Sequence, residues 1–411
     1  NHSLLMTDAA QPGFLPDFNS VIVDEAHNLV TSAYQQFKTK WSEQDTSYLL
    51  QTVDPSFPRS ARWNNILHKI SELEPSIGHL RDDLKESVKQ AQKCLKDFML
   101  ALSEDNHNRF TPAKAYQDKP ILGLLEKVYA PVTHEIYGMN KSLEHVLSIL
   151  EKIRKSVLEM DPSRTDYSVL HSVLDRGLET TSSLMNSLIR LTENQDNDWV
   201  YWMEGEYRSP NTPKEKLIIS LHASLVDVAE TLKEQFFKRF DYCLLTSATL
   251  KVNNSFSYFV RRIGLDESDK VITKEFLSPF LYNEQVTYHQ YGGSREISTD
   301  PTMIGELVYH LHKTLGKRTM VLFTSRKALT DTANYLKEKP GGRDLPLFAQ
   351  TRGASRPGII KGMHQHPNGI LFGTNSFWEG VDLPGDLLEI LILVKLPFDV
   401  PSEPLVKSYS E

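Results

Sequence analysis

The sequence predicts an α/β protein with parallel sheets, whose first α/β layer is split by a long all-helical insertion. Three observations predict this fold. The short apolar run FNSVIVD (18–24) has the composition of a strand buried on both faces. Residues 30–195 follow a helical pattern. After residue 280, strands alternate with helices of about ten residues or more, which is typical of a parallel sheet wrapped by helices.

Within the insertion, apolar residues recur in alternating steps of three and four, so each set lies along one helix face. The stretch NKSLEHVLSILEKIRKSVLEM (140–160) has no Gly or Pro to interrupt it. These stretches predict a helical bundle with solvated charged faces, and none of them resembles a catalytic group. The three sets are Leu84, Val88, Ala91, Leu95 and Phe98; Leu143, Val146, Leu150, Ile153, Val157 and Met160; and Leu170, Leu174, Leu184, Leu188 and Leu191.

The remaining elements are assigned from apolar runs and turn signals. The predicted strands are DWVYWM (198–203), KLIISL (216–221), DYCLLTSATL (241–250), EQVTYHQY (284–291), RTMVLF (318–323), LPLFAQ (345–350), GILFGT (369–374) and LEILILVKL (388–396). The predicted helices are LVDVAETLKEQFFKRF (225–240), MIGELVYHLHKTL (303–315), KALTDTANYLKEK (327–339) and RPGIIKGMHQH (356–366). The pattern predicts four parts: a first α/β part (1–29), the insertion (30–198), the rest of the first layer (199–252) and a second layer (253–411).

Composition limits the class of protein. Hydrophobic residues make up 40% of the 411 residues and charged residues 24%, as in globular proteins of more than one domain. No apolar run approaches the roughly 18 residues of a membrane span, and the first residues lack the plan of a signal peptide, so we expect an intracellular protein without a membrane partner. Cys94 and Cys243 are too few for a disulfide framework, and we expect both to be buried. The net charge of −7 speaks against a nucleic-acid partner but leaves room for a local basic groove.

The strand VIVDEAHNLV (21–30) ends in two acids and an imidazole, Asp24, Glu25 and His27. Ligands of parallel α/β sheets bind beyond the carboxyl ends of the strands. There, one carboxylate can hold a hydrated Mg²⁺, and the next can orient or deprotonate a water. The alternative is that Asp24 caps the following helix and that His27 is an ordinary loop residue.

Other strand ends are also polar. LLTSATL (244–250) ends in Thr246, Ser247 and Thr249, hydroxyls that could bond a neighbouring acidic cluster or form a turn. VLFTSRKAL (321–329) places Thr324 and Ser325 before a helix, where hydroxyls and amides suit a phosphate. FGTNSFWEGVDLPGD (372–386) is a polar, Gly-interrupted loop between two apolar strands, which favours a ligand loop.

The motifs DEAH, TSATL, FTSR and SFWEGVDLPG occur in this order. They resemble the motifs of the superfamily 2 helicases, and the resemblance to the DinG/XPD branch is close. They correspond to motifs II, III, IV and V, and NHSLLM resembles the Asn-His segment that precedes motif II in DinG-like proteins. The resemblance implies two RecA-like motor domains with an arch-like insertion between motifs II and III.

The resemblance also implies roles for the first set of residues. Asp24 would coordinate the Mg²⁺ of Mg-ATP, and Glu25 would activate the hydrolytic water. His27, together with Ser247 and Thr249, would couple the nucleotide state to the DNA-binding groove.

From the second motor domain, the resemblance implies that Gly380 and Asp382, with Glu379 beside them, face the nucleotide. Contacts to the backbone of single-stranded DNA would come from Thr324, Ser325 and Thr374. Aromatic residues have their own alternatives: Phe377 and Trp378 either stack on a base or pack between the lobes, whereas we expect Trp199 and Trp202 in the core.

Two family motifs are missing from the sequence. It contains no G-x-x-x-x-G-K-[ST] phosphate loop and no Gln-x-x-Gly-Arg segment after residue 400, where motif VI would supply arginines. We therefore expect a fragment that binds and hydrolyses ATP poorly. The ligands of an iron-sulfur cluster would lie upstream, so this sequence does not support such a cluster.

Two functions of different classes follow. The first is an ATP-dependent DNA helicase that translocates 5′ to 3′ on single strands in DNA repair or replication. It would be a monomer in the bacterial cytoplasm, acting on single-stranded DNA and on forked or tailed duplexes. The alternative is a nucleotide-regulated module that binds single-stranded DNA for an attached N-terminal 3′–5′ exonuclease, without unwinding.

Overall fold

The computed structural model describes residues 1–57, 61–106, 121–122, 132–160, 168–193, 196, 198–207, 217–266, 270–293, 300–351, 353–399, 401 and 403–408. The chain divides into two compact units. The first unit comprises Asn1–Lys274 with Val400–Glu411, and the second unit comprises Glu275–Asp399.

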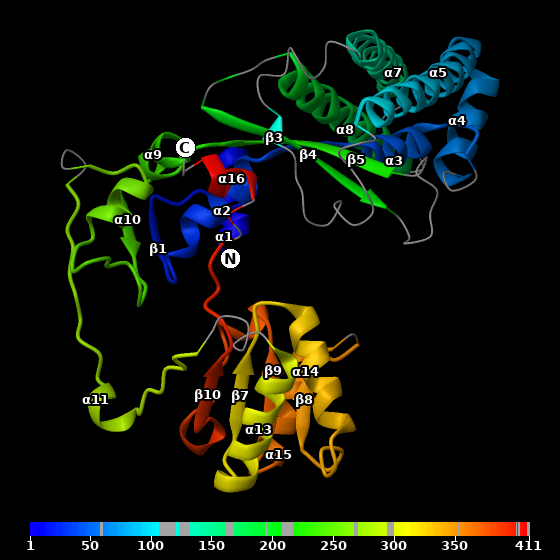
Figure 1. Ribbon diagram of the computed structural model, residues 1–411. Coiled ribbons are helices and arrows are strands. Elements are labelled where there is room, and N and C mark those ends of the chain that lie inside the picture. Colours follow the sequence, from blue (N-terminus) through cyan, green and yellow to red (C-terminus); the bar gives the residue numbers. More distant parts are fainter. Residues whose placement is uncertain are drawn as a thin grey trace. The chain divides into compact units, whose positions relative to one another are not determined.

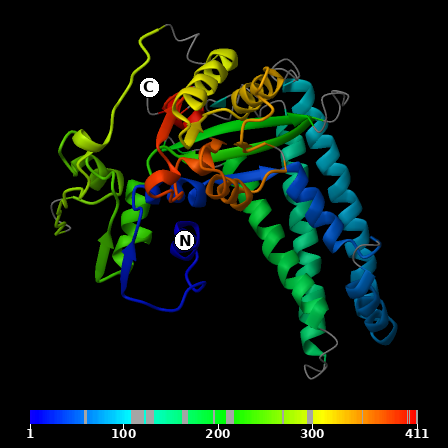
Figure 2. The same cartoon turned by 90° about the horizontal axis from the view of Figure 1, so that it is seen from below.

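The first unit contains the helical bundle predicted for the insertion, in which long helices lie side by side (Figures 1 and 2). The predicted apolar seams form its core; all of their residues are buried except Met160, which is partly buried. Ser42 begins the first of these helices by accepting a hydrogen bond from the Asp45 amide at 3.1 Å. The helices are α3 (Glu43–Val53), α4 (Ala61–Leu73), α5 (Pro75–Asn106), α7 (Thr133–Glu159) and α8 (Ser168–Thr192).

The insertion is not all-helical, which corrects the sequence prediction. The bundle packs on a four-stranded antiparallel sheet in the order β2-β5-β4-β3. Two of its strands were predicted as strands of the first motor domain, but they pair with segments inside the insertion instead. Tyr201, Met203, Ile219 and Leu221 of this sheet join the bundle core. The strands are β2 (Thr39–Ser42), β3 (Ile121–Leu122), β4 (Trp199–Tyr207) and β5 (Leu217–Leu225).

The first unit also holds a two-stranded parallel sheet, β1 with β6, in the register Val23↔Leu245. One face of this sheet packs on a core that includes Val23, Leu29 and Phe236. The predicted helix at 225–240 is shorter than expected and ends in a 3-10 turn. The elements of this part are α1 (His2–Ala10), β1 (Ser20–Val23), α2 (Asn28–Phe37), α9 (Ala229–Gln235), η5 (Phe237–Arg239), β6 (Tyr242–Leu245), α10 (Ser257–Arg262) and α16 (Pro404–Ser408).

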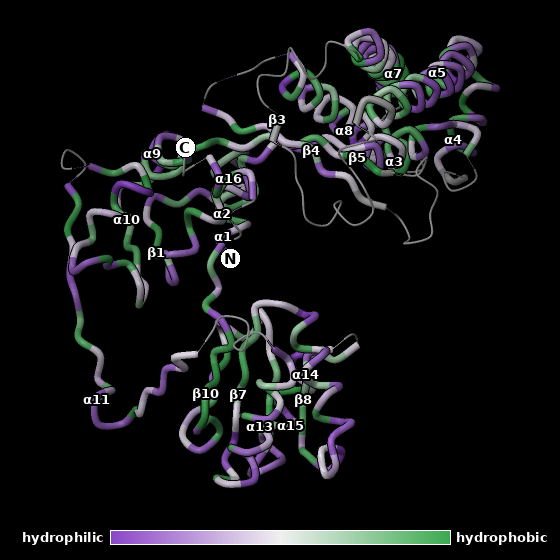
Figure 3. Tube along the Cα trace, in the orientation of Figure 1, coloured by the Kyte–Doolittle hydropathy of each residue, from purple (hydrophilic) through white to green (hydrophobic). Residues whose placement is uncertain are grey.

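The second unit is a parallel four-stranded sheet in the order β10-β7-β9-β8, and the hydrophobic strand β10 stands out in Figure 3. Helices α13 and α14 pack on one face, whereas α15 and the loop after β9 pack on the other. The elements are α11 (Tyr282–Gln285), α13 (Pro301–Leu315), β7 (Thr319–Leu322), α14 (Arg326–Glu338), β8 (Leu347–Ala349), α15 (Arg356–Gln365), β9 (Ile370–Gly373), η7 (Asn375–Phe377), η8 (Gly385–Leu387) and β10 (Ile390–Leu393).

The α/β class with parallel sheets is thus confirmed, and so is the order of elements from 303 to 396. The prediction of a strand at 284–291 is wrong, because that segment begins within α11 and residues 286–291 belong to no helix or strand. The four domain boundaries stay a prediction. The compact units divide at Lys274, and Ile263, which follows α10, packs in the core of the first unit.

Candidate functional site

Pairing of β1 with β6 brings two of the polar strand ends together. Since Val23 lies beside Leu245, the next residues, Asp24 and Thr246, emerge at the same edge of the sheet. The backbone continues the ladder, with Thr246 N donating to Val23 O and Ala26 N donating to Thr246 O, both at 2.9 Å. The Thr246 hydroxyl then donates to Asp24 Oδ1 at 2.8 Å.

Asp24 is exposed and held as a carboxylate. Its Oδ1 also accepts from the Glu25 amide at 3.0 Å. The Thr246 hydroxyl and then the Glu25 amide lower the pKa of Asp24 below its usual value, because both hydrogen bonds favour the charged form. The alternative that Asp24 caps helix α2 is not supported, since the N-cap of α2 is His27 and the Asp24 carboxylate bonds to Glu25 and Thr246 instead.

A magnesium ion fits this carboxylate. Within the described residues, Asp24 Oδ2 takes part in no hydrogen bond, and no three His, Cys, Asp or Glu side chains gather into a metal-binding group. Mg²⁺ commonly binds through one or two carboxylates while waters and substrate phosphates fill its remaining positions. Asp24 can therefore hold a hydrated Mg²⁺ without a dedicated protein cage.

Glu25, His27 and Ser247 form a second group beside Asp24. The Nδ1 atom of His27 lies 2.7 Å from the Ser247 hydroxyl and 3.4 Å from Glu25 Oε2. The Ser247 hydroxyl lies 3.5 Å from the same carboxylate oxygen. Glu25 has a φ of 50°, a left-handed conformation that is rare for a residue with a side chain and that turns the chain sharply after Asp24.

Two more residues contact this cluster through backbone atoms. The amide of Thr249 donates to the Ser247 hydroxyl at 3.4 Å, so Thr249 supports the turn after β6, and its role as a coupling residue stays a prediction. His2 Nε2 lies 2.9 Å from the carbonyl oxygen of Asp24. His2 was not among the predicted site residues, although the Asn-His segment signalled its position.

In the second unit, Thr324 and Ser325 follow β7. Thr324 is exposed. Ser325 is the N-cap of α14, and its hydroxyl accepts from the Ala328 amide at 3.4 Å. This hydroxyl therefore caps α14. A phosphate at this position would contact the amides of the α14 N-terminus.

Thr374 begins the loop after β9 and is buried. Its amide and its hydroxyl both donate to Gln350 Oε1 at 2.9 Å, and Gln350 Nε2 donates to Ser376 Oγ at 2.9 Å. The Thr374 hydroxyl thus donates to Gln350 within the second unit, and its contact to DNA stays a prediction. Phe377 is 2% exposed and packs within the second unit, where Trp378 also lies partly buried.

Glu379, Gly380 and Asp382 lie on the exposed part of this loop. Gly380 has a φ of +67°, a conformation that glycine adopts without strain. Arg356 Nη2 donates to the carbonyl oxygens of Gly380 and, at 3.2 Å, of Glu379. The sequence analysis did not identify Gln350 and Arg356 as residues that hold this loop. The only sequence signal for them was their position, after β8 and at the start of α15.

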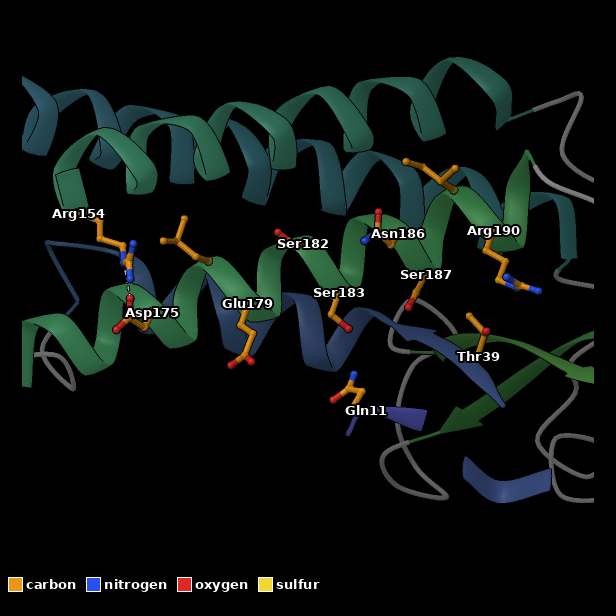
Figure 4. A pocket seen from close by; sticks show the side chains of 12 residues that line it. Gln11, Thr39, Arg154, Asp175, Glu179, Ser182, Ser183, Asn186, Ser187 and Arg190 are labelled. Carbon is orange, nitrogen blue, oxygen red and sulfur yellow. Dashed lines mark hydrogen bonds and ion pairs between the residues drawn. The ribbon is translucent and has the colours of Figure 1, made fainter. Parts of the chain in front are cut away.

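A cavity of about 1010 Å³ lies along α8 in the first unit (Figure 4). Ser183, Ser187 and Arg190 of α8 line the cavity, and so do Arg154 and Asp175, which form an ion pair. None of the site residues predicted from the sequence lines this cavity. Trp199 and Trp202 lie on β4, where Trp202 is buried and Trp199 is packed against the bundle core, as predicted.

Comparison with known proteins finds relatives of this chain. Residues 308–411 match the family model described as a helicase C-terminal domain. Over 431 aligned residues, the chain is 30% identical to the 3′–5′ exonuclease DinG of Bacillus subtilis, covering 98% of this chain and 44% of that protein. The chain thus resembles this DinG along almost its whole length.

Another relative is the ATP-dependent DNA helicase YoaA of Haemophilus influenzae, 27% identical over 420 residues that cover all of this chain and 56% of that protein. The DinG-like chain thus spans about half the length of the curated relatives it matches. A solved structure titled XPD_APO aligns with a TM-score of 0.41 at 13% identity, over 97% of this chain and 66% of that one. Within the described residues of the DinG-like chain, no helix is long and apolar enough to cross a membrane.

Proposed function

We propose that the full-length protein is an ATP-dependent DNA helicase of the DinG/XPD type, which translocates 5′ to 3′ on single-stranded DNA in repair or replication. One observation carries the proposal: Asp24, Glu25 and His27 meet Thr246 and Ser247 in one hydrogen-bonded group at neighbouring parallel strand ends. Similarity to DinG and YoaA over the whole chain supports it.

The residues of the first unit would divide the work of ATP hydrolysis. Asp24 holds Mg²⁺, which neutralises phosphate charge when it is bound. Glu25 orients the attacking water and accepts its proton. His27 contacts both the Glu25 carboxylate and the Ser247 hydroxyl, so a change at Glu25 alters the segment after β6. That contact is the proposed coupling between nucleotide and DNA.

The second unit would supply the other nucleotide-facing residues, Glu379, Gly380 and Asp382. Contacts to the phosphates of single-stranded DNA would come from Thr324 and from the N-terminus of α14 at Ser325. The proposed substrates are single-stranded DNA and forked or tailed duplexes, bound by a monomer.

An exposed apolar face supports the proposal that this chain is part of a larger motor. The outer face of the β1–β6 sheet carries Ile22, Tyr242 and Leu244, which are 73%, 77% and 57% exposed. Parallel sheets are normally covered on both faces, so further chain would pack there in the full-length protein. We expect the 411 residues alone to hydrolyse ATP at a negligible rate, and measurable turnover by the purified chain would contradict this view.

The substitution Glu25→Gln in the full-length protein tests the proposed function. It keeps the size of the side chain but removes the base, so DNA-stimulated ATP hydrolysis should fall about a hundredfold to a thousandfold while ATP still binds. Glu230→Gln, on the exposed start of α9, is the control and should leave the rate unchanged. Full hydrolysis by the Glu25→Gln protein would sink the role given to Glu25.

A second function is favoured by the name of one relative, the 3′–5′ exonuclease DinG of Bacillus subtilis. In this alternative, the chain is a nucleotide-regulated module that grips single-stranded DNA for an attached exonuclease and unwinds nothing. A strand-displacement assay on tailed duplexes separates the two. Opening of the duplex that depends on ATP excludes the alternative, whereas DNA binding without opening supports it.

A further inference from the structure

The loop from 374 to 386, called here the 374–386 loop, is held from outside at its start, middle and end. Gln350 holds its start through Thr374 and Ser376. Arg356 holds its middle at the carbonyls of Glu379 and Gly380. At its end, the buried Arg318 donates to the carbonyl oxygen of Asp386 at 3.0 Å. The conformation of this loop therefore depends on three side chains that lie elsewhere in the second unit.

Arg356 itself has a fixed place. It is the first residue of α15, which Ser355 caps by accepting from the Gly358 amide at 3.3 Å. Its guanidinium carbon lies 5.6 Å from the ring centre of Phe377. Phe377 is in turn fixed against Gly373, where a Cβ would come within 2.6 Å of the Phe377 Cβ. A rigid helix start and a buried ring thus set the position of the guanidinium before it meets the loop.

The bonds made by Arg356 constrain two consecutive peptide groups. Its Nη2 donates to the carbonyls of Glu379 and Gly380, at the turn where Gly380 has a φ of +67°. Rotation of either peptide would turn its carbonyl away from a charged donor, and bonds to charged groups are the stronger ones. Among the described residues, the Arg356 guanidinium forms no ion pair, and its hydrogen bonds go to the two loop carbonyls.

We propose that Arg356 is a positioning residue of the nucleotide site: it fixes the Glu379–Gly380 and Gly380–Val381 peptides and thereby sets where the carboxylates of Glu379 and Asp382 point. This inference rests on the proposed function, because that function gives these carboxylates their nucleotide. Arg356 acts through the loop and need not touch the nucleotide.

Hydrogen exchange on the 411-residue chain, without nucleotide, tests the contact directly. In Arg356→Ala, amides from 376 to 383 should exchange about tenfold faster, while those of β7 and β9 keep their rates. Lys361→Ala is the matched control, since it removes an exposed cation from the same helix without a contact to the loop, and it should change nothing. Unchanged exchange in the loop of Arg356→Ala would overturn the proposal.

ATP hydrolysis by the full-length protein tests the consequence. Arg356→Ala should lower kcat/KM for ATP about tenfold, and added guanidinium ion should restore part of the loss, which a general structural defect would not permit. Arg356→Lys should fall in between, because an ammonium cannot reproduce the planar fork. A loosened loop with normal kcat/KM would overturn the positioning role. If the unsubstituted protein lacks DNA-stimulated ATPase activity, the proposed function fails, and the exchange result still decides whether Arg356 fixes the loop.

Discussion

At the ends of β1 and β6, the candidate residues hydrogen-bond mainly to one another through their side chains, as His27 does with Ser247 and Thr246 does with Asp24. In the 374–386 loop, by contrast, side chains from outside bond largely to the loop's backbone, as Arg356 and Arg318 do. Bonds between exposed functional groups can be exchanged when a ligand arrives. Bonds to carbonyls fix a shape in advance. The first unit therefore has the arrangement of a responsive site and the second that of a preset one.

Removal of Arg318 should have the largest effect on stability, because this side chain fixes backbone carbonyls of the second unit. Besides Asp386, this buried guanidinium holds the carbonyls of Met363 and His366, at 3.1 and 2.9 Å, where α15 ends. Arg318→Met keeps the length of the side chain but leaves these carbonyls without their donor. We expect the free energy of unfolding of the second unit to fall by about 3 kcal/mol in urea titrations.

The neighbouring substitution Lys317→Met is the control for Arg318→Met. Lys317 pairs with Glu389 on the surface and is 53% exposed, so its loss should cost about 0.5 kcal/mol or less. If both variants lost the same free energy of unfolding, the carbonyl contacts of Arg318 would contribute no more than an exposed ion pair. The contrast between the two units would then weaken.

Acidification should reveal a smaller effect in the first unit, at the buried carboxylate of Asp8. This group accepts from the amides of Gly13, Phe14 and Leu15 and pairs with Arg239 at 2.7 Å. Arg239, more than any other neighbour, lowers the pKa of Asp8. Because the pKa is lower in the folded state, the stability that Asp8 contributes is present at neutral pH and is lost as pH falls through the folded value.

Thermal unfolding between about pH 6 and about pH 3 measures this contribution. Asp8→Asn should lower the melting temperature of the first unit by several degrees at the upper end of the range, and the difference from the unsubstituted chain should shrink towards the lower end. Asp266→Asn, at an exposed carboxylate that pairs with Lys233, should change little at either end. A difference that stays constant with pH would contradict the assignment to the Asp8 carboxylate.

The smallest effect on stability is expected in the first unit, at the hydrogen bond between His27 and Ser247. A double-mutant cycle with His27→Ala and Ser247→Ala should give a coupling free energy of about 1 kcal/mol for unfolding. The exposed pair of Lys327 with Asp331 in α14 provides the comparison and should give about 0.3 to 0.5 kcal/mol. A cycle with no coupling would show that the 2.7 Å contact does not hold the strand ends together.

Local patterns predicted the elements from 303 to 396 in the second unit well, because each of these elements carries its own signal. Helix α13, for example, begins after Asp300, which caps it, and ends at Gly316 with a φ of +58°. The antiparallel sheet of the first unit was misassigned, because Thr39–Ser42 pairs with Leu217–Leu225 across a long stretch of sequence. No local pattern specifies a partner at that separation, so strands that were recognised were given to the wrong sheet.

The same distinction separates the two candidate sites. Asp24, Glu25 and His27 were singled out because their carboxyl and imidazole side chains follow one another directly after an apolar strand, a pattern that the sequence itself displays. Arg356 and Gln350 were missed, since their partners include backbone carbonyls or buried hydroxyls, and any residue type can supply a carbonyl. A sequence thus indicates which groups are available for chemistry far better than which groups hold them in place.

The left-handed conformation of Glu25 implies that stability and the proposed catalytic role favour different residues at this position. A non-glycine residue with a φ of 50° carries a conformational cost that glycine does not, on the order of 1 kcal/mol. Glu25→Gly would therefore ease the backbone while it removes the proposed base. A search for thermostable variants that ignores activity would favour this substitution, and the gain in stability would be accompanied by loss of the proposed catalytic base.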